Sequence, residues 1–215
     1  MSAPSSDIAF TASVKAAQTA HGSREAYARM EAKGGFRTEI TPELTAFLEE
    51  IDTAFLTTAS ADGQPYTQHR GGPPGFIRPL GPDLLGFADY AGNRQYITTG
   101  NLEENDRAFL FLMDYARARR VKLWGRAQMT DDADIIARLM PADYKARPEQ
   151  ALLFKVAAWD TNCSQHIPRK VNLTDVAVMI AQRDERIREL EALLASRSQS
   201  FAAATPTLEP TQLER

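Results

Sequence analysis

The chain contains few of the residues that form disulfides or soft-metal sites. Among its 215 residues there is one cysteine, Cys163, and only three histidines. A single cysteine excludes a disulfide within the chain, and so few thiol and imidazole groups argue against a structural zinc site. We therefore expect no bound metal and a core that depends on apolar packing.

Long apolar runs and a strong excess of one charge are also missing. No run of about eighteen apolar residues indicates a membrane span. The sequence begins without a basic stretch followed by an apolar one, so we expect a cytoplasmic protein with no membrane partner. The 25 Lys and Arg residues against 28 Asp and Glu residues give a net charge of −3. This charge provides no field for a polyphosphate, and nucleic acid is not an expected partner.

What is present is the composition of a globular protein. Hydrophobic residues make up 43% and charged residues 25% of the chain, which excludes a fibrous or wholly disordered chain. Changes in composition and in the hydrophobic pattern then divide the chain into a helical lead-in over 1–50, a β-rich domain over 51–170, a helix over 171–195 and a disordered tail over 196–215. In the lead-in, Ser23 and Thr41 are the expected helix N-caps, with Pro42 opening the second of these helices.

The central domain alternates short β-branched and aromatic runs with turn residues. A hairpin is expected from Ile51 to Arg70, with its turn at Asp62-Gly63. Further strands are expected over 75–80, 84–89, 107–114, 119–129 and 150–159, and short helices over 95–105 and 131–140. The pattern predicts a mainly β fold of six to seven antiparallel strands that closes into a barrel, with flanking helices.

One of these strands is apolar on both of its faces. Within RAFLFLMD, residues Ala108, Leu110 and Leu112 alternate with Phe109, Phe111 and Met113. A strand of this kind is expected to be covered on both sides, by the barrel interior and by a second layer.

The predicted C-terminal helix has an apolar heptad seam. Leu173, Ile180, Ile187 and Leu194 share one heptad position, and Val176, Arg183 and Leu190 share the other. Six of these seven positions are apolar. Docking on the barrel of the same chain and pairing with a second chain both explain the seam.

Two short segments have the chemistry of an anion site. In the strand over 119–129, alternation places the side chains of Arg120, Lys122 and Arg126 on one face, which either holds an anion or is a solvated strand face. In the turn Gly92-Asn93-Arg94, the glycine allows a tight turn, Asn93 can cap a following helix, and Arg94 can present its guanidinium at the helix N-terminus. A plain strand-to-helix connection also explains this turn.

Taken together, four segments resemble a known family. They are GQPYTQHRGGPPGF, LLGFADYAGNRQ, ENDRAFLFLMD and RRVKLWGRAQ, and they occur in the family's order at similar spacing over about residues 50 to 160. This arrangement resembles the pyridoxamine 5'-phosphate oxidase-related, FMN-binding split-barrel family. The resemblance implies a split β-barrel, FMN as the cofactor, and a homodimer in which both chains build the flavin site.

The resemblance also implies a set of cofactor-binding residues. Arg70 would bind the ribityl chain or phosphate, Arg94 would bind the phosphate, and Arg120 would take the place of a glutamine that faces the isoalloxazine ring. The remaining members of the implied set are Gln68, His69, Gly71, Ala88, Asp89, Asn93, Gln95 and Lys122. Gln95 replaces a lysine of the family pattern. The ending that closes true pyridoxamine phosphate oxidases on their substrate is absent, so vitamin B6 oxidation is not the leading reaction.

The stretch AWDTNCSQHIPRK is a second polar constellation, similar to a Trp-Asp-x-Asn-Cys-x-Gln-His-Ile-Pro stretch of related flavoproteins. Its Trp159, Asn162, Cys163 and His166 are candidate substrate-pocket residues. An equally good interpretation is a turn whose amides satisfy buried backbone groups, with Cys163 as a small buried hydrophobe. A Cys-His nucleophile is disfavoured because no third orienting group is visible.

Two functions follow from these observations. The first is an FMN-dependent oxidoreductase that transfers hydride or electrons to a small-molecule substrate, with NAD(P)H as a candidate reductant. The alternative is a non-catalytic flavin-binding or redox-sensing module that recruits a partner through its C-terminal helix. The sequence assigns no catalytic residue.

Overall fold

The computed structural model describes residues 3–161 and 164–204, with side chains described as far as Arg197. The chain forms two compact units that divide between Arg169 and Lys170. The first unit carries the sheet and the second carries one long helix. No helix in these described residues is both long and apolar enough to cross a membrane.

The first unit begins with short helices, as the sequence predicts. Thr41 caps α3, because its Oγ1 accepts a hydrogen bond from the amide of Leu44 at 3.3 Å. Ser23 is the N-cap residue of α2, as predicted, but its side chain makes no capping hydrogen bond: its backbone is already in the right-handed helical region, and its hydroxyl turns back to the carbonyl of Gln18. The elements are η1 (Ser5–Ile8), α1 (Ala12–Ala20), α2 (Arg24–Glu31) and α3 (Pro42–Glu50).

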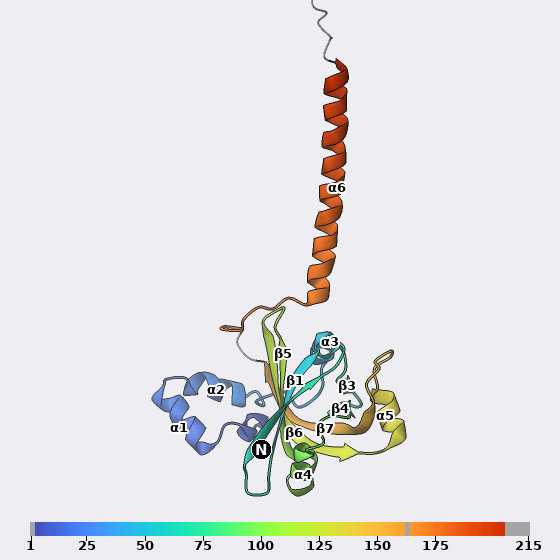
Figure 1. Cartoon of the computed structure of the whole chain (residues 1–215). Helices are drawn as coiled ribbons and strands as arrows, with labels where there is room; N and C mark the ends of the chain where they lie inside the picture. Colours follow the sequence, from blue (N-terminus) through green and yellow to red (C-terminus); the bar gives the residue numbers. More distant parts are fainter. Residues whose placement is uncertain (1–2, 162–163, 205–215) are drawn as a thin grey trace, which may run out of the picture. The chain divides into compact units, whose positions relative to one another are not determined.

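A seven-stranded sheet forms the centre of the first unit (Figure 1). The strand order is β2-β1-β5-β6-β7-β4-β3, and each neighbouring pair is antiparallel. The predicted mainly β fold of six to seven antiparallel strands with flanking helices is confirmed. The strands are β1 (Thr53–Ala59), β2 (Pro65–Gly71), β3 (Arg78–Pro79), β4 (Leu84–Tyr90), β5 (Arg107–Asp114), β6 (Arg119–Thr130) and β7 (Pro148–Thr161).

The sheet is open, which corrects the expectation of a closed barrel. Among the described strands, β2 and β3 each pair on one side only. β3 has just two residues, and its Pro79 has no amide hydrogen to donate to another strand. The β1–β2 hairpin turns where predicted, at Asp62-Gly63, and Gly63 adopts the left-handed φ of 91° that this turn requires.

Two shorter helices follow β4 and β6. They are α4 (Ile97–Glu104) and α5 (Ala133–Leu139). Leu102 of α4 joins the main core, whereas Leu139 of α5 forms a second cluster with Ala88 of β4 and Ala151 of β7. These two helices therefore cover different parts of the sheet.

The main core lies on the face of the sheet that β1, β5 and β6 share. Leu56, Leu110 and Leu123 have no exposed surface, and the indole of Trp159 in β7 is 1% exposed. The opposite face of β5 is covered less completely than predicted: Met113 is buried, but Phe109 and Phe111 remain half-buried. Phe109 contacts Trp124 of β6 at a ring-centroid distance of 5.2 Å. An aromatic face is thus left partly open in the single chain.

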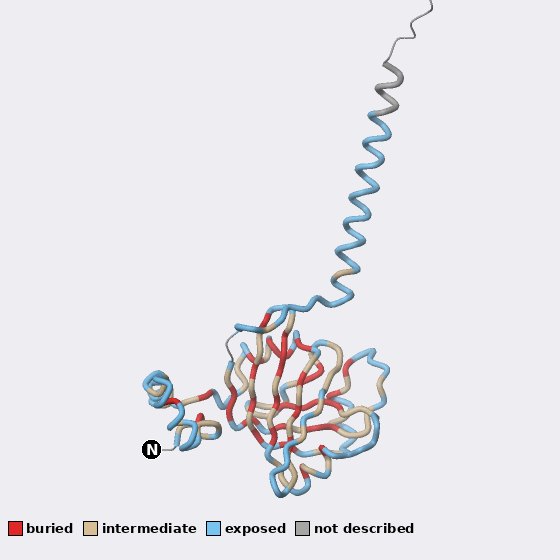
Figure 2. The backbone as a smooth tube through the Cα atoms, turned by 60° about the vertical axis from the view of Figure 1, so that its left-hand side comes forward, coloured by how far each residue is buried: buried red, intermediate tan, exposed pale blue. Residues whose placement is uncertain are grey.

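The second unit is the helix α6 (Leu173–Ala204). It continues to Ala204, so the predicted helix end at 195 is corrected, and residues 196–204 are helical where a disordered tail was expected. Its apolar seam is exposed: Leu173 is 87%, Ile180 53% and Leu194 64% accessible. Figure 2 shows exposed residues along almost the whole described helix.

Candidate functional site

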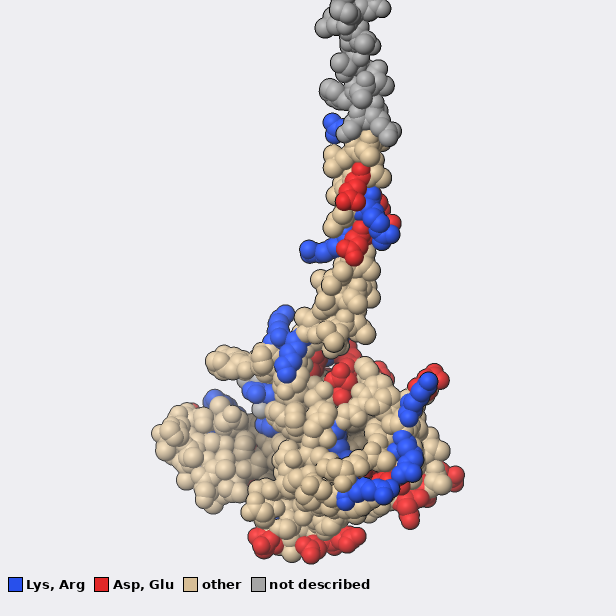
Figure 3. All heavy atoms as spheres, viewed as in Figure 1, with Lys and Arg blue, Asp and Glu red and all other residues tan. Residues whose placement is uncertain are grey.

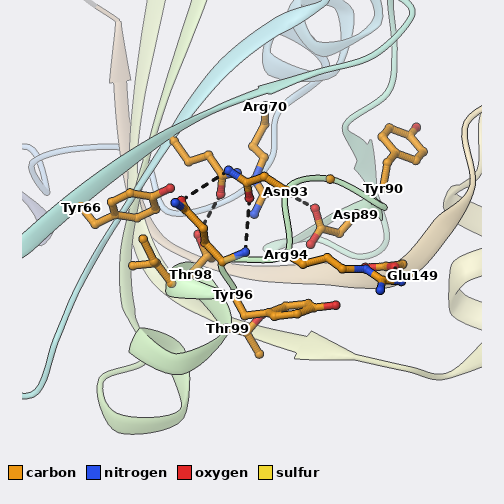
Figure 4. A pocket seen from close by; sticks show the side chains of 14 residues that line it. Tyr66, Arg70, Asp89, Tyr90, Asn93, Arg94, Tyr96, Thr98, Thr99 and Glu149 are labelled. Carbon is orange, nitrogen blue, oxygen red and sulfur yellow. Dashed lines mark hydrogen bonds and ion pairs between the residues drawn. The ribbon is translucent and has the colours of Figure 1, made fainter.

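A polar pocket lies between β2, β4 and the turn that precedes α4. Its volume is about 260 Å³. Gln68 and Arg70 reach it from the inward face of β2, where they alternate with the exposed Thr67 and His69. Asp89 reaches it from the end of β4, and Asn93 and Arg94 reach it from the turn (Figure 4). Gln95 of the same turn also lines the pocket. Six of the predicted cofactor residues therefore share one pocket: Gln68, Arg70, Asp89, Asn93, Arg94 and Gln95.

A second pocket of about 180 Å³ adjoins the first. Arg70, Asp89 and Tyr90 line both pockets. The second pocket adds three further predicted residues, His69, Gly71 and Ala88, which lie beside Phe76 and Phe87. We call the two adjoining pockets the groove.

An ion pair separates the two halves of the groove. The guanidinium of Arg70 donates to the carboxylate of Asp89, and these side chains are 13% and 18% exposed. Burial raises the pKa of Asp89, and Arg70 counters this rise only in part. Nε of Arg70 is buried and has no hydrogen-bond partner. The pair therefore leaves one buried guanidinium donor of Arg70 unsatisfied.

The turn before α4 differs from its predicted form. We expected Asn93 to cap the helix, but α4 begins at Ile97 and its N-cap is Tyr96, which has no side-chain capping bond. The Asn93 side chain instead accepts a hydrogen bond from the amide of Gln95 at 3.3 Å. Arg94 is thus three residues before the helix and does not lie at its N-terminus. The cause is local, because Asn93 closes a turn of its own.

The backbone of this turn is strained. Arg94 has a φ of 60° and Tyr96 a φ of 52°, both in the left-handed region that side chains other than glycine rarely adopt. Strain of this kind gathers at sites where a precise backbone shape is used. It marks the turn as the candidate binding loop of the groove.

Arg94 is held near the groove by a carboxylate from a distant strand. Its Nη2 lies 3.5 Å from Oε1 of Glu149 in β7, and its side chain is 63% exposed (Figure 4). Arg147 also reaches the Glu149 carboxylate, at 3.0 Å. An exposed pair at this distance is weak, so the Arg94 guanidinium can turn to an anionic ligand at little cost.

Two predicted cofactor residues lie outside the groove. Arg120 lines a third pocket of about 250 Å³ with Phe47 and Trp159, and its Nε is buried without a partner. Lys122 lies on the outer face of β6, 3.4 Å from Asp160, with its ammonium 5.2 Å from the ring centre of Trp124. Within one chain the strand of cations and the turn at Arg94 do not meet.

The two described members of the predicted substrate pocket, Trp159 and His166, do not line the groove. Trp159 is a core residue whose indole nitrogen donates to the carbonyl of Glu39 at 2.7 Å, although one part of it borders the third pocket. His166 is exposed and has a left-handed φ of 62°. Asn162 and Cys163 lie outside the described residues.

Several groove residues were not predicted from the sequence. Tyr66 precedes Gln68 and Arg70 at the same two-residue alternation, so extending the strand pattern would have found it. Tyr96 and Thr98 follow the turn directly, and the Thr98 hydroxyl donates to the Gln68 side chain at 3.1 Å. No pattern in the sequence around Glu149 indicates that this residue belongs to the groove. It reaches the groove only because β7 pairs with β4, Gln150 opposite Asp89.

The fold and the groove together define a class. This is an open antiparallel β protein with a polar groove beside one edge strand of its sheet, lined by two arginines. A family model described as pyridoxamine 5'-phosphate oxidase matches residues 40–163, which is more than half of the chain. The chain belongs to this family, and the resemblance drawn from the sequence is confirmed.

Solved structures with a similar chain course include three bacterial proteins. HupZ of Group A Streptococcus is 16% identical, with 61% of this chain and 99% of that chain covered and a TM-score of 0.47. An FMN-binding protein of Syntrophomonas wolfei is 10% identical, with 67% and 97% covered and a TM-score of 0.44. General stress protein 26 of Bacillus anthracis is 14% identical, with 54% and 88% covered and a TM-score of 0.42. No curated protein matches the chain at the significance that we required.

Proposed function

We propose that this chain binds FMN in the groove and acts as a cytoplasmic FMN-dependent oxidoreductase on a small-molecule substrate. One observation carries the proposal. Of the eleven residues that the family resemblance implied, nine line the groove: Gln68, His69, Arg70, Gly71, Ala88, Asp89, Asn93, Arg94 and Gln95. They come from two strands and a turn, and they converge on one ion pair.

The chemistry of the groove suits a phosphorylated, partly aromatic ligand. At one end, the Arg94 guanidinium and the strained turn offer donors to a phosphate. In the middle, the free Nε of Arg70 and the amide of Gln68 offer hydrogen bonds to hydroxyl or carbonyl groups. Tyr66 and Tyr90 add aromatic surface. FMN, when bound, would supply hydride or electron transfer, and these residues would orient it.

We further propose that the functional form is a homodimer. The third pocket, with Arg120, shares no lining residue with the groove. A second copy of the chain would bring its Arg120 to the groove of the first. The half-buried Phe109 and Phe111 give that copy an apolar surface to cover.

The test starts from the absorption spectrum of the purified protein and a titration with FMN. We expect a flavin spectrum and saturation at one FMN per chain. NAD(P)H should then bleach the bound flavin at rates typical of turnover. A protein that binds no flavin contradicts the whole proposal.

A second function is favoured by the exposed seam of α6. A flavin-binding or redox-sensing module would use that helix to recruit a partner and would need no turnover. Saturable FMN binding without reduction by NADH, NADPH or any other reductant tried would support this module against the enzyme.

A further inference from the structure

The α6 helix carries an apolar seam that nothing in its own unit covers. A helix of 32 residues is about 48 Å long. Ile187 is 52%, Leu190 43% and Leu194 64% exposed. Helices draw most of their stability from packing of an apolar face, so a helix that leaves this face in water calls for a covering surface.

Two exposed ion pairs lie within α6 itself. Arg186 pairs with Glu189 at 2.7 Å, and Arg188 pairs with Glu185 at 2.9 Å. Figure 3 shows the charged side chains gathered in the middle of the helix, with uncharged stretches on both sides. Exposed apolar side chains therefore remain at the seam positions and beside them, at Val178, Met179 and Leu193.

We infer that α6 pairs with the α6 of a second copy as a parallel, in-register coiled coil. The heptad assignment carries this inference. Ile180 and Ile187 occupy the a positions at the centre of the seam, and Leu190 occupies a d position. β-branched residues at a with leucine at d favour two parallel strands over larger assemblies.

Charge complementarity selects the direction of the pair. In a parallel pair, a g residue lies beside the e residue of the next heptad on the other helix. Arg186 is at g and Glu191 at the following e, so each helix offers the partner an opposite charge, twice by symmetry. In an antiparallel pair, e residues of one helix would lie beside e residues of the other. In the charged heptads these are Asp184 and Glu191, which are both negative and repel each other.

Arg183 is the one charged residue among the seven predicted seam positions, and the same geometry accounts for it. A d residue of a parallel pair packs next to the e residue of the other helix in the same heptad. For Arg183 that residue is Asp184. A polar seam residue lowers stability but fixes register and strand number. We therefore assign to Arg183 the role of fixing the register of this helix pair.

Disulfide trapping in the full-length chain tests the inference. In a Cys163→Ser background, Val176→Cys and Leu190→Cys each place one thiol at a d position. These positions lie 14 residues apart, about 21 Å along the helix. Glu185→Cys, at the outward f position, is the matched control. Under mild oxidation we expect both d variants to shift to twice the chain mass on non-reducing gels, and the control to stay at the mass of one chain.

The outcomes separate the possible occupants of the seam. An antiparallel pair can join at most one of the two d positions to itself, so a cross-linked dimer in only one of the two d variants overturns the parallel pair. Equal cross-linking of all three variants, as a dimer held elsewhere would give, overturns the inference. The inference is also overturned if none of the three variants forms a cross-link. That result would mean that the seam packs on the chain's own barrel or on another protein.

A charge exchange provides a second, independent measurement. Added to the Leu190→Cys variant, Arg186→Glu should lower the rate of cross-linking, because the carboxylate introduced at position 186 would then face Glu191 of the second copy. Adding Glu191→Arg should restore it. An unchanged rate in the single charge variant, or no recovery in the double one, contradicts the parallel pair.

Discussion

Arg70 and Asp89 form an ion pair that stands between the two halves of the groove. The two residues lie on β2 and β4, strands that are not neighbours in the sheet. Burial raises the pKa of Asp89, and Arg70 is the main group that opposes this rise. The Asp89 carboxylate thus depends on Arg70 to stay ionised, which makes the pair a sensitive point for both stability and binding.

Replacing Arg70 should be more damaging than replacing Asp89. Arg70→Gln leaves a largely buried carboxylate without its cation and should lower the free energy of unfolding by about 2–4 kcal/mol. Asp89→Asn leaves the Arg70 guanidinium without its anion, but burial already opposes ionisation of Asp89 by raising its pKa, so removing this charge should cost less. Lys155→Gln is the control, since its partner Asp83 lies at 2.6 Å but the lysine is 61% exposed. That change should cost no more than about 1 kcal/mol.

The Arg70→Gln defect should also depend on pH. Without Arg70 the pKa of Asp89 rises further above its ordinary value, so the folded state binds a proton more readily than the unfolded state. The cost of ionising Asp89 is absent below its ordinary pKa and fully present above the raised one. Urea unfolding of both proteins should therefore show a deficit that grows as the pH rises above the ordinary pKa of 3.8 toward neutrality. A deficit that shrinks over this range would mean that the Asp89 carboxylate is not the source.

Arg94 should recognise the phosphate of FMN and not its ring system. A charge-assisted hydrogen bond contributes about 1.5–3 kcal/mol, so Arg94→Ala should weaken FMN binding by about one to two orders of magnitude. Riboflavin, which has no phosphate, should bind almost as before. Arg147→Ala is a matched control, because Arg147 also pairs with Glu149 but does not line the groove. Equal losses for FMN and riboflavin would make Arg94 structural.

Asp114 should stabilise the fold above its ordinary pKa and lose this effect in acid. Burial by itself raises the pKa of Asp114, but hydrogen bonds from the Arg117 amide at 2.9 Å and the Arg119 guanidinium at 3.0 Å lower it overall. At neutral pH, Asp114→Asn should cost about 1–3 kcal/mol.

The difference in free energy of unfolding between wild type and Asp114→Asn should become smaller as the pH falls below 3.8, the ordinary pKa of an aspartate. The reason is that protonation of Asp114 removes the same charge that the substitution removes. Chemical denaturation at neutral pH and at about pH 3 checks this. Asp131→Asn, at an exposed position, is the control. A gap that stays constant with pH would mean that the lost interaction is not ionic.

Gly125 should tolerate no side chain. A Cβ atom there would lie 2.2 Å from the carbonyl oxygen of Lys155 and 2.6 Å from the Phe154 ring, at the bulge where β6 and β7 shift register. Gly125→Ala should cost at least about 3 kcal/mol, because a backbone atom has to move. Gly100→Ala has open space within α4 and should add about 0.5–1 kcal/mol. Melting temperatures that fall equally in both variants would contradict the packing argument.

The proposed homodimer depends on the aromatic face of β5. Phe111→Asp should lower FMN affinity, and in a chain whose α6 helices do not pair it should also convert the protein from twice the chain mass to the mass of one chain in light scattering. Tyr144→Asp, at an aromatic side chain 40% exposed outside this face, should leave the mass unchanged. If the α6 pair holds the two chains together, Phe111→Asp should lower FMN affinity without changing the mass.

Local sequence determined the elements and half of the groove. TAFLTTA and RAFLFLMD are short runs rich in β-branched or aromatic residues, which is typical of strands, and Thr41 before Pro42 satisfies a helix N-terminus within one turn. Both features can therefore be predicted without tertiary context. The family pattern supplied Arg70, Asp89 and Arg94 because these lie in short segments of regular order. The two-residue β3 and the continuation of α6 to Ala204 had no comparable local signal.

Tertiary structure decided which of these residues meet. Glu149 reaches Arg94 across some fifty residues of chain because β7 pairs with β4, and no local pattern encodes a pairing of that range. Arg120 and Lys122 carry the right charge for an anion site, yet the strand order places β6 three positions from β2 and next to β7. Charge and periodicity are properties of a segment and can be predicted from it, whereas the convergence of a site is a property of the sheet order.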